Sequence, residues 1–91
     1  MPMKKISIQK MSPEELKIKG VSSWPIWTKE VSRFDWTYAG KEECYIIEGE
    51  FFVETDEGTV QIKPGDFVIF SDGLKCSWDI KSPVKKYYNF P

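Results

Sequence analysis

Apolar and polar residues alternate along most of the chain after Trp27, which is typical of β-strands with one buried face. Glycine, proline and aspartate interrupt this alternation every few residues, as strand connections require. Gly49 is one turn predicted in this way, and Ser82 with Pro83 is another. The predicted strands are 28–38, 43–48, 50–55, 59–62, 67–70, 74–80 and 84–90. Short strands at this spacing indicate a β-sandwich or a β-barrel.

The chain before Trp24 predicts one more strand and a short helix. Residues 6–8 alternate as a strand does. Ser12 then provides a helix cap, Pro13 suits the first helical position, and Glu15 completes a capping box. Gly20 ends the predicted helix after about two turns.

Length and composition limit the class of protein. The 91 residues are enough for one domain, which we place at residues 1–91. Hydrophobic residues make up 41% of the chain and aromatic residues 15%, which is enough for a core. Thirteen basic and fourteen acidic residues give a net charge of −1, which argues against nucleic acid as a partner. No apolar run is long enough to span a bilayer and the first residues do not form a signal-peptide core, so we expect no membrane partner and a cytoplasmic location.

The chain contains no histidine, which removes several large classes of enzyme site. Catalytic triads, Cys–His pairs and histidine-bound metals all need an imidazole. We therefore expect no cofactor.

Two segments resemble the sequence motifs of the cupins, which are small jelly-roll barrels. The segment from Glu42 to Gly49 resembles the second half of the first cupin motif, with these two residues at its glutamate and glycine positions. The segment from Gly65 to Cys76 has the spacing of the second motif, with Ser71 in place of the proline and Cys76 in place of the histidine. The resemblance implies an all-β, single-domain cupin jelly-roll barrel with a short N-terminal helix.

The chain also departs from the cupin motifs at the positions that usually hold a metal. Asp35 and Thr37 stand where the first motif has its two histidines. A divalent metal, if one binds, would therefore have Asp35, Glu42 and Cys76 as ligands, a donor set that is uncommon without imidazole. The pattern of aromatic residues along the chain is similar to that of small cupins grouped with ureidoglycine aminohydrolase-like and ethanolamine-utilisation proteins. Single-domain members, including a small thermophile cupin known mainly from structural genomics, resemble the chain nearly end to end, which implies a homodimer and no settled substrate.

Strand periodicity combined with this resemblance predicts a polar site inside the barrel. Alternate residues share a face, so 33, 35 and 37 point one way on one strand, and 76 and 78 share a face on a later strand. The residues expected to converge are Arg33, Asp35, Thr37, Glu42, Cys76 and Trp78.

Several roles are open to these residues. Asp35 and Glu42 are candidate acid–base groups, because two carboxylates in one dry pocket have their pKa values pushed apart. Cys76 is a buried hydrophobe, a metal ligand or a nucleophile. Arg33 is either an anion anchor or the partner of an internal ion pair with Asp35 or Glu42. Tyr45 is a candidate ligand-binding hydroxyl.

Thr37 and Trp78 complete the candidate ligand-binding set, with the Trp78 ring as a wall for a small planar or apolar ligand. Two lysine pairs, 4–5 and 85–86, are interpreted as solvated. Trp24 and Trp27 flank Pro25 in an extended segment that places its rings on the core or against a second subunit.

Two functional hypotheses follow. The first is that the barrel interior binds a small anionic or nitrogenous metabolite, with aminohydrolase or lyase chemistry implied only by the family resemblance. The alternative is a non-catalytic homodimeric interaction module, because two thin cores fused across a dimer bury more aromatic surface than one.

Overall fold

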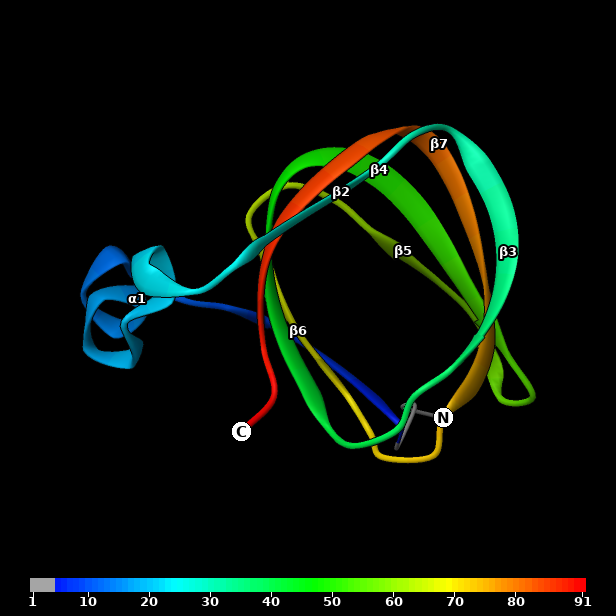
Figure 1. The fold of residues 1–91 in the computed structure, drawn as a ribbon, viewed down its shortest axis with the longest axis horizontal. Coiled ribbons are helices and arrows are strands. Elements are labelled where there is room, and N and C mark those ends of the chain that lie inside the picture. Colours follow the sequence, from blue (N-terminus) through cyan, green and yellow to red (C-terminus); the bar gives the residue numbers. More distant parts are fainter. Residues whose placement is uncertain (1–4) are drawn as a thin grey trace.

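The computed structural model describes residues 5–91, which fold into an antiparallel β-sheet curled into a barrel (Figure 1). Its strands, in chain order, are β1 (Ile6–Lys10), β2 (Ile26–Lys29), β3 (Ser32–Thr37), β4 (Glu42–Thr55), β5 (Gly58–Ile62), β6 (Asp66–Phe70) and β7 (Lys75–Asn89). The long strands β4 and β7 pair with each other. β7 also pairs with β2 and β3, while β4 also pairs with β5 and β6, and β1 pairs with β6. The predicted all-β barrel is confirmed.

β4 and β7 are each continuous where the sequence pattern predicted turns, at Gly49 and at Ser82 with Pro83. Instead of turning, both strands bend at this point, and the register between them shifts on either side of Gly49. Gly49 has a φ of +97°, and a Cβ there would lie 2.4 Å from the Pro83 carbonyl oxygen. The two strands approach so closely here that only glycine fits, and a bulge in their antiparallel pairing replaces the two expected turns.

The N-terminal helix forms as its sequence predicts. In α1 (Pro13–Lys19) the Ser12 hydroxyl accepts a hydrogen bond from the Glu15 amide, and the Glu15 carboxylate accepts one from the Ser12 amide. Gly20 ends the helix with a φ of +70°. Within residues 5–91, no helix is long and apolar enough to cross a membrane.

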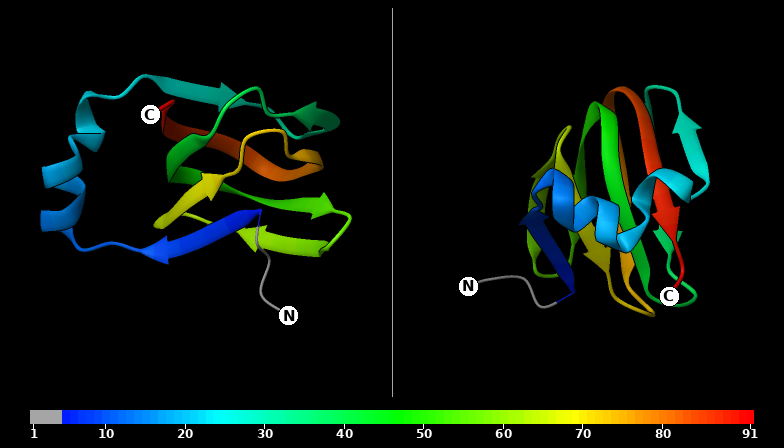
Figure 2. Two further views of the ribbon diagram at one scale, coloured as in Figure 1. Left: turned by 90° about the horizontal axis from the view of Figure 1, so that it is seen from below. Right: turned by 90° about the vertical axis from the view of Figure 1, so that its left-hand side faces the viewer.

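α1 and the following 3-10 turn η1 (Val21–Ser23) lie outside the barrel and connect β1 to β2 beside one end of the strands (Figure 2). No residue of α1 is buried. The connection is held on the outer face of the sheet, where Trp24 packs on Phe67 and the Lys19 ammonium lies 3.5 Å from a Glu43 carboxylate oxygen.

Aromatic stacking dominates the barrel interior. Phe51 stacks on Trp78 with ring centroids 4.3 Å apart, and Tyr38 stacks on Phe70 at 4.8 Å. Trp27 meets Trp78 edge-on at 5.7 Å, so the predicted docking of its ring on the core is confirmed. The other buried core side chains include Cys44, Ile46, Val53, Ile62, Val68, Ile80 and Val84.

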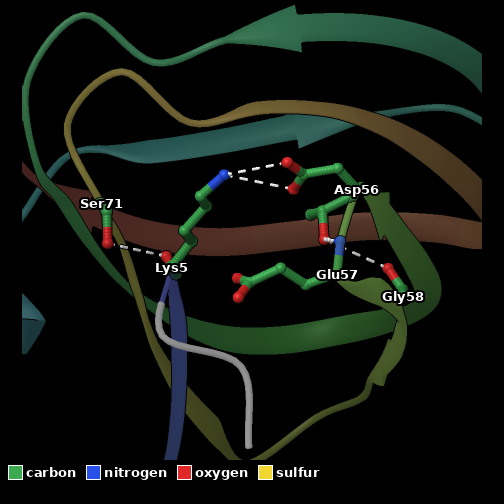
Figure 3. Close-up of polar contacts among 6 residues, drawn as sticks. Lys5, Asp56, Glu57, Gly58 and Ser71 are labelled. Carbon is green, nitrogen blue, oxygen red and sulfur yellow. Dashed lines mark hydrogen bonds and ion pairs between the residues drawn. The ribbon is translucent and has the colours of Figure 1, made fainter. Parts of the chain in front are cut away.

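Lys5 links the start of β1 to two distant turns (Figure 3). Its carbonyl oxygen accepts hydrogen bonds from the Ser71 amide and hydroxyl, each at 2.9 Å. Its ammonium reaches the β4–β5 hairpin, 3.2 Å from an Asp56 carboxylate oxygen. The Lys5 side chain is exposed, as expected, while Lys4 lies outside the described residues. Exposed ion pairs of this kind stabilise a fold little.

Candidate functional site

A cavity of about 720 Å³ lies in the barrel between β2, β3, β7 and the start of β4. Its size falls within the range of small-molecule sites in proteins. More than half of its lining residues are aromatic, and of its five charged lining residues only Glu42 and Lys86 are buried; the others are Lys29, Glu30 and Asp35. The aromatic lining comprises Trp27, Phe34, Trp36, Tyr38, Trp78, Tyr88 and Phe90.

Lys86 and Glu42 form an ion pair inside the barrel. The Lys86 ammonium donates to a Glu42 carboxylate oxygen at 2.7 Å, and the residues are only 5% and 6% exposed. The same ammonium lies 4.9 Å from the ring centroids of both Trp27 and Trp78. A buried charge needs such partners, because removing it from water is costly. The cavity wall therefore holds a buried ammonium and a buried carboxylate beside its aromatic side chains.

The interior position of Lys86 corrects the prediction that residues 85 and 86 are solvated. Val84, Lys86 and Tyr88 alternate along β7, and Val84 is buried in the core, so Lys86 faces inward with it. Lys86 also lies opposite the buried Ile46 of β4. Alternation with Val84 was the signal in the sequence that could have identified Lys86.

Arg33, Asp35 and Thr37 lie on the outside of the barrel, so their predicted convergence in its interior is wrong. The register pairs Phe34 with Trp78 and residue 36 with residue 76, which places the even-numbered residues of β3 on the inner face. All three odd-numbered side chains are exposed. Asp35 is at the edge of the cavity, and its carboxylate accepts a hydrogen bond from the Ser77 hydroxyl at 2.6 Å. Alternation had shown which residues share a face, but not which face is inside.

Arg33 has its ion-pair partners on this outer surface, and not at Asp35 or Glu42 as proposed from the sequence. Its guanidinium donates two hydrogen bonds to the Glu54 carboxylate, at 2.7 and 2.8 Å. These bonds raise the pKa of Arg33 and lower the pKa of Glu54. The guanidinium also lies 3.6 Å from Asp79. Arg33 is therefore not available to anchor an anion in the cavity.

Both cysteines are free and buried. The Cys76 thiol lies 3.6 Å from the Trp36 carbonyl oxygen, and burial raises its pKa. Burial also raises the pKa of Cys44, to about 12. Protonated thiols are poor nucleophiles, so the interpretation of Cys76 as a buried hydrophobe agrees best with its surroundings.

The metal-ligand set considered from the sequence does not assemble. Within residues 5–91, no three carboxylate or thiol side chains lie close enough together to hold a metal ion, so Asp35, Glu42 and Cys76 are not a ligand group.

Tyr45 also lies away from the cavity. Tyr45 pairs with Phe67 and with Tyr87 on the neighbouring strands. Its side chain points to the opposite face of the sheet from that of its neighbour Cys44, which is in the core. Its predicted role as a ligand-binding hydroxyl in the interior is not compatible with this position.

Trp78 and Tyr38 contribute polar atoms to the aromatic interior. In the described part of the chain, the Trp78 indole N–H is buried without a hydrogen-bond partner. Burial, with the nearby Glu42 carboxylate, raises the pKa of Tyr38, so its hydroxyl keeps its proton. Three of the predicted site residues line the cavity: Trp78, a candidate for ligand binding, and Glu42 and Asp35, the candidate acid–base groups.

Comparison with known proteins agrees with this architecture. The sequence matches the family described as EutQ-like cupin domain over residues 16–88. The structure is similar to that of a DUF861 family protein from Thermotoga maritima, with 48% identity and a TM-score of 0.92 over 96% of this chain and 100% of that one. No curated protein matches the chain.

Two EutQ proteins share the fold at lower identity. The Clostridium difficile EutQ protein has 19% identity and a TM-score of 0.65, over 94% of this chain and 68% of that one. A putative ethanolamine utilization protein from Salmonella typhimurium has 21% identity and a TM-score of 0.64, over 91% and 66%. These two structures agree in fold, and the family match over residues 16–88 confirms the resemblance that the two sequence motifs indicated.

Proposed function

The chain belongs to the EutQ-like cupin family, and on this basis we propose that its barrel cavity binds a small metabolite with an apolar body and an anionic oxygen group such as a carboxylate. The observation that carries the proposal is the buried Lys86–Glu42 pair in the aromatic cavity wall. Apolar residues of similar volume would commonly stabilise a barrel at least as well as a buried ion pair. Charges retained in such a position therefore favour a role in binding.

Each part of the cavity suits one part of such a ligand. An ammonium has three N–H donors, and Glu42 accepts a hydrogen bond from Lys86, so Lys86 has donors left for a ligand oxygen. The rings of Trp27 and Phe34 line the cavity and offer apolar surface for the ligand body. Trp36 and Phe90, which are both exposed, mark the side from which a ligand enters.

Aminohydrolase or lyase chemistry at this site would use Glu42 as the acid–base group. Glu42 lies in the cavity wall beside Lys86, whereas Asp35 is engaged by Ser77 outside and Cys76 stays protonated. The proposed binding function does not require this chemistry.

Ligand titrations followed by tryptophan fluorescence test the binding proposal, because Trp27 and Trp78 line the cavity. The probes are acetate, benzoate and phenylacetate, each compared with its neutral amide. We expect saturable quenching with at least one carboxylate, and affinity for its amide weaker by about tenfold or more, since hydrogen bonds to charged groups are the stronger ones.

Variants then assign this binding to Lys86. Lys86→Met should abolish it, as should the double variant Lys86→Met/Glu42→Leu, which leaves no buried charge unpaired. Lys85→Met, altered at the neighbouring position of the same strand, should bind as the unaltered chain does. Absence of saturable binding to every probe, or equal binding by the folded double variant, would overturn the proposal.

A homodimer is a second candidate, supported by large apolar side chains that are exposed at the surface. Ile26, on the edge strand β2, is 49% exposed, and Trp36 and Phe90 are 53% and 56% exposed. Trp24 and Trp27 are less suited to an interface, since they pack on Phe67 and Trp78 of their own chain. Sedimentation velocity should show a dimer that Ile26→Lys dissociates, whereas a monomer at all concentrations would contradict it.

A further inference from the structure

The surroundings of the Lys86 amine suit covalent as well as ionic chemistry. Lys86 is one of the residues that line the 720 Å³ cavity. A carboxylate oxygen of Glu42 lies 2.7 Å from the Lys86 nitrogen, and this nitrogen lies 4.9 Å from the centroids of the Trp27 and Trp78 rings. We propose that Lys86 forms an imine with a small aldehyde or ketone bound in this cavity, an inference that rests on the proposed ligand-binding function of the same cavity.

Glu42 is placed to move the protons that this reaction needs. It first takes one proton from the Lys86 ammonium, which frees the nitrogen lone pair. The lone pair attacks the carbonyl carbon and forms the C–N bond of a carbinolamine, whose oxygen takes up a proton lost by nitrogen. Glu42 then returns its proton to the hydroxyl group, which leaves as water while the C=N bond forms. The net reaction converts the ammonium and the carbonyl compound into a protonated imine and one water molecule.

The protonated imine would keep the partners that now stabilise the ammonium. It carries the same single positive charge at the same nitrogen, so the Glu42 carboxylate remains its counter-ion. The faces of Trp27 and Trp78 attract either cation. The apolar groups of the carbonyl compound would lie against Phe34 and Tyr88, which line the same cavity. Aromatic walls also keep bulk water from the C=N bond and so slow its hydrolysis.

Reductive trapping with benzaldehyde and cyanoborohydride tests the proposal in the unaltered chain. Cyanoborohydride reduces a protonated imine to a stable secondary amine, so each event adds one benzyl group to one lysine. At limiting aldehyde and neutral pH, peptide mapping by mass spectrometry compares Lys86 with Lys85, its neighbour on β7. We expect Lys86 to react about a hundredfold faster, the order of gain from a positioned proton acceptor. Equal labelling of the two lysines in the folded chain would overturn the proposal.

Two further measurements distinguish its failure from failure of the binding proposal. A carboxylate that the fluorescence titration identifies as a ligand should protect Lys86, but not Lys85, from benzylation. Binding of that carboxylate without fast labelling of Lys86 would reject the imine alone, whereas absence of both would reject the two proposals together.

Glu42→Gln should slow labelling of Lys86 about a hundredfold while Lys85 is unaffected, because a carboxamide cannot accept the proton. Undiminished labelling in this folded variant would show that Glu42 is not the proton acceptor.

Discussion

Glu42 and Lys86 depend on each other, because each is buried and each is the counter-charge of the other. Lys86→Met should lower the free energy of unfolding by about 3–5 kcal/mol, since it leaves an uncompensated carboxylate in the barrel. The double variant Lys86→Met/Glu42→Leu should recover most of this loss, because it removes both charges. Urea unfolding followed by circular dichroism measures both effects.

Lys85→Met is the control for that measurement, and we expect it to change the free energy of unfolding by no more than about 0.5 kcal/mol. If the single variant Lys86→Met is as stable as the double variant, the two charges are not coupled as their 2.7 Å separation indicates.

Cys44 should make the fold sensitive to alkaline pH. Its thiol has a pKa of about 12 in the barrel against an ordinary value of 9.0, because burial disfavours the thiolate. Between these two values the unfolded chain loses the proton and the folded chain keeps it. The unfolded state is therefore favoured progressively as the pH rises through this window.

Urea unfolding at about pH 8 and about pH 10.5 measures this loss of stability, which should be smaller in Cys44→Ala than in the unaltered chain. Other groups that titrate in this range affect both proteins alike, so the difference between them isolates Cys44. Equal losses would show that this thiol ionises as readily inside the barrel as in solution.

At the scale of single elements, the bulge between β4 and β7 is the position that tolerates a side chain least. Gly49→Ala would combine a positive φ with a Cβ 2.4 Å from the Pro83 carbonyl oxygen. Gly40, with a φ of +104°, has nothing within 4 Å of the position that a Cβ would take, so Gly40→Ala should cost only the backbone strain of about 1–2 kcal/mol. We expect Gly49→Ala to cost at least about 2 kcal/mol more, as displaced backbone adds to that strain. Thermal unfolding of both variants measures the difference, and equal midpoints would show that the backbone at the β4–β7 bulge can relax.

The same elements show what could and could not be predicted from the sequence. The helix cap at Ser12 and the stop at Gly20 were predicted because their partners lie within four residues. The bend at Gly49 was taken for a turn because its cause, the backbone of Pro83, is distant in sequence. For the site, alternation predicted which side chains share a face of β3, but the inward face is set by pairing with Trp78 of β7. Long-range register, which no local pattern encodes, separates Arg33 from the cavity.

The whole molecule is held together by pairing between segments far apart in the chain. β4 pairs with β7 from Glu43 opposite Asn89 onward, and β1 pairs with β6. Such topologies fold slowly because loop closure precedes their contacts, so we expect refolding in milliseconds to seconds, on the order found for all-β barrels. Stopped-flow tryptophan fluorescence should show this phase, and refolding in microseconds would contradict it.

β7 is made after the other six strands of this barrel, yet it is the strand with which β2, β3 and β4 all pair. At translation rates of about 5–20 residues per second, its 15 residues take roughly 1–3 s to synthesise. During that time a nascent chain offers an unpaired edge of β4 and no partner for β2 or β3. The ribosome-bound chain is therefore at its most vulnerable to aggregation just before β7 emerges, and a premature stop codon before Lys75 would release a chain that cannot close its barrel.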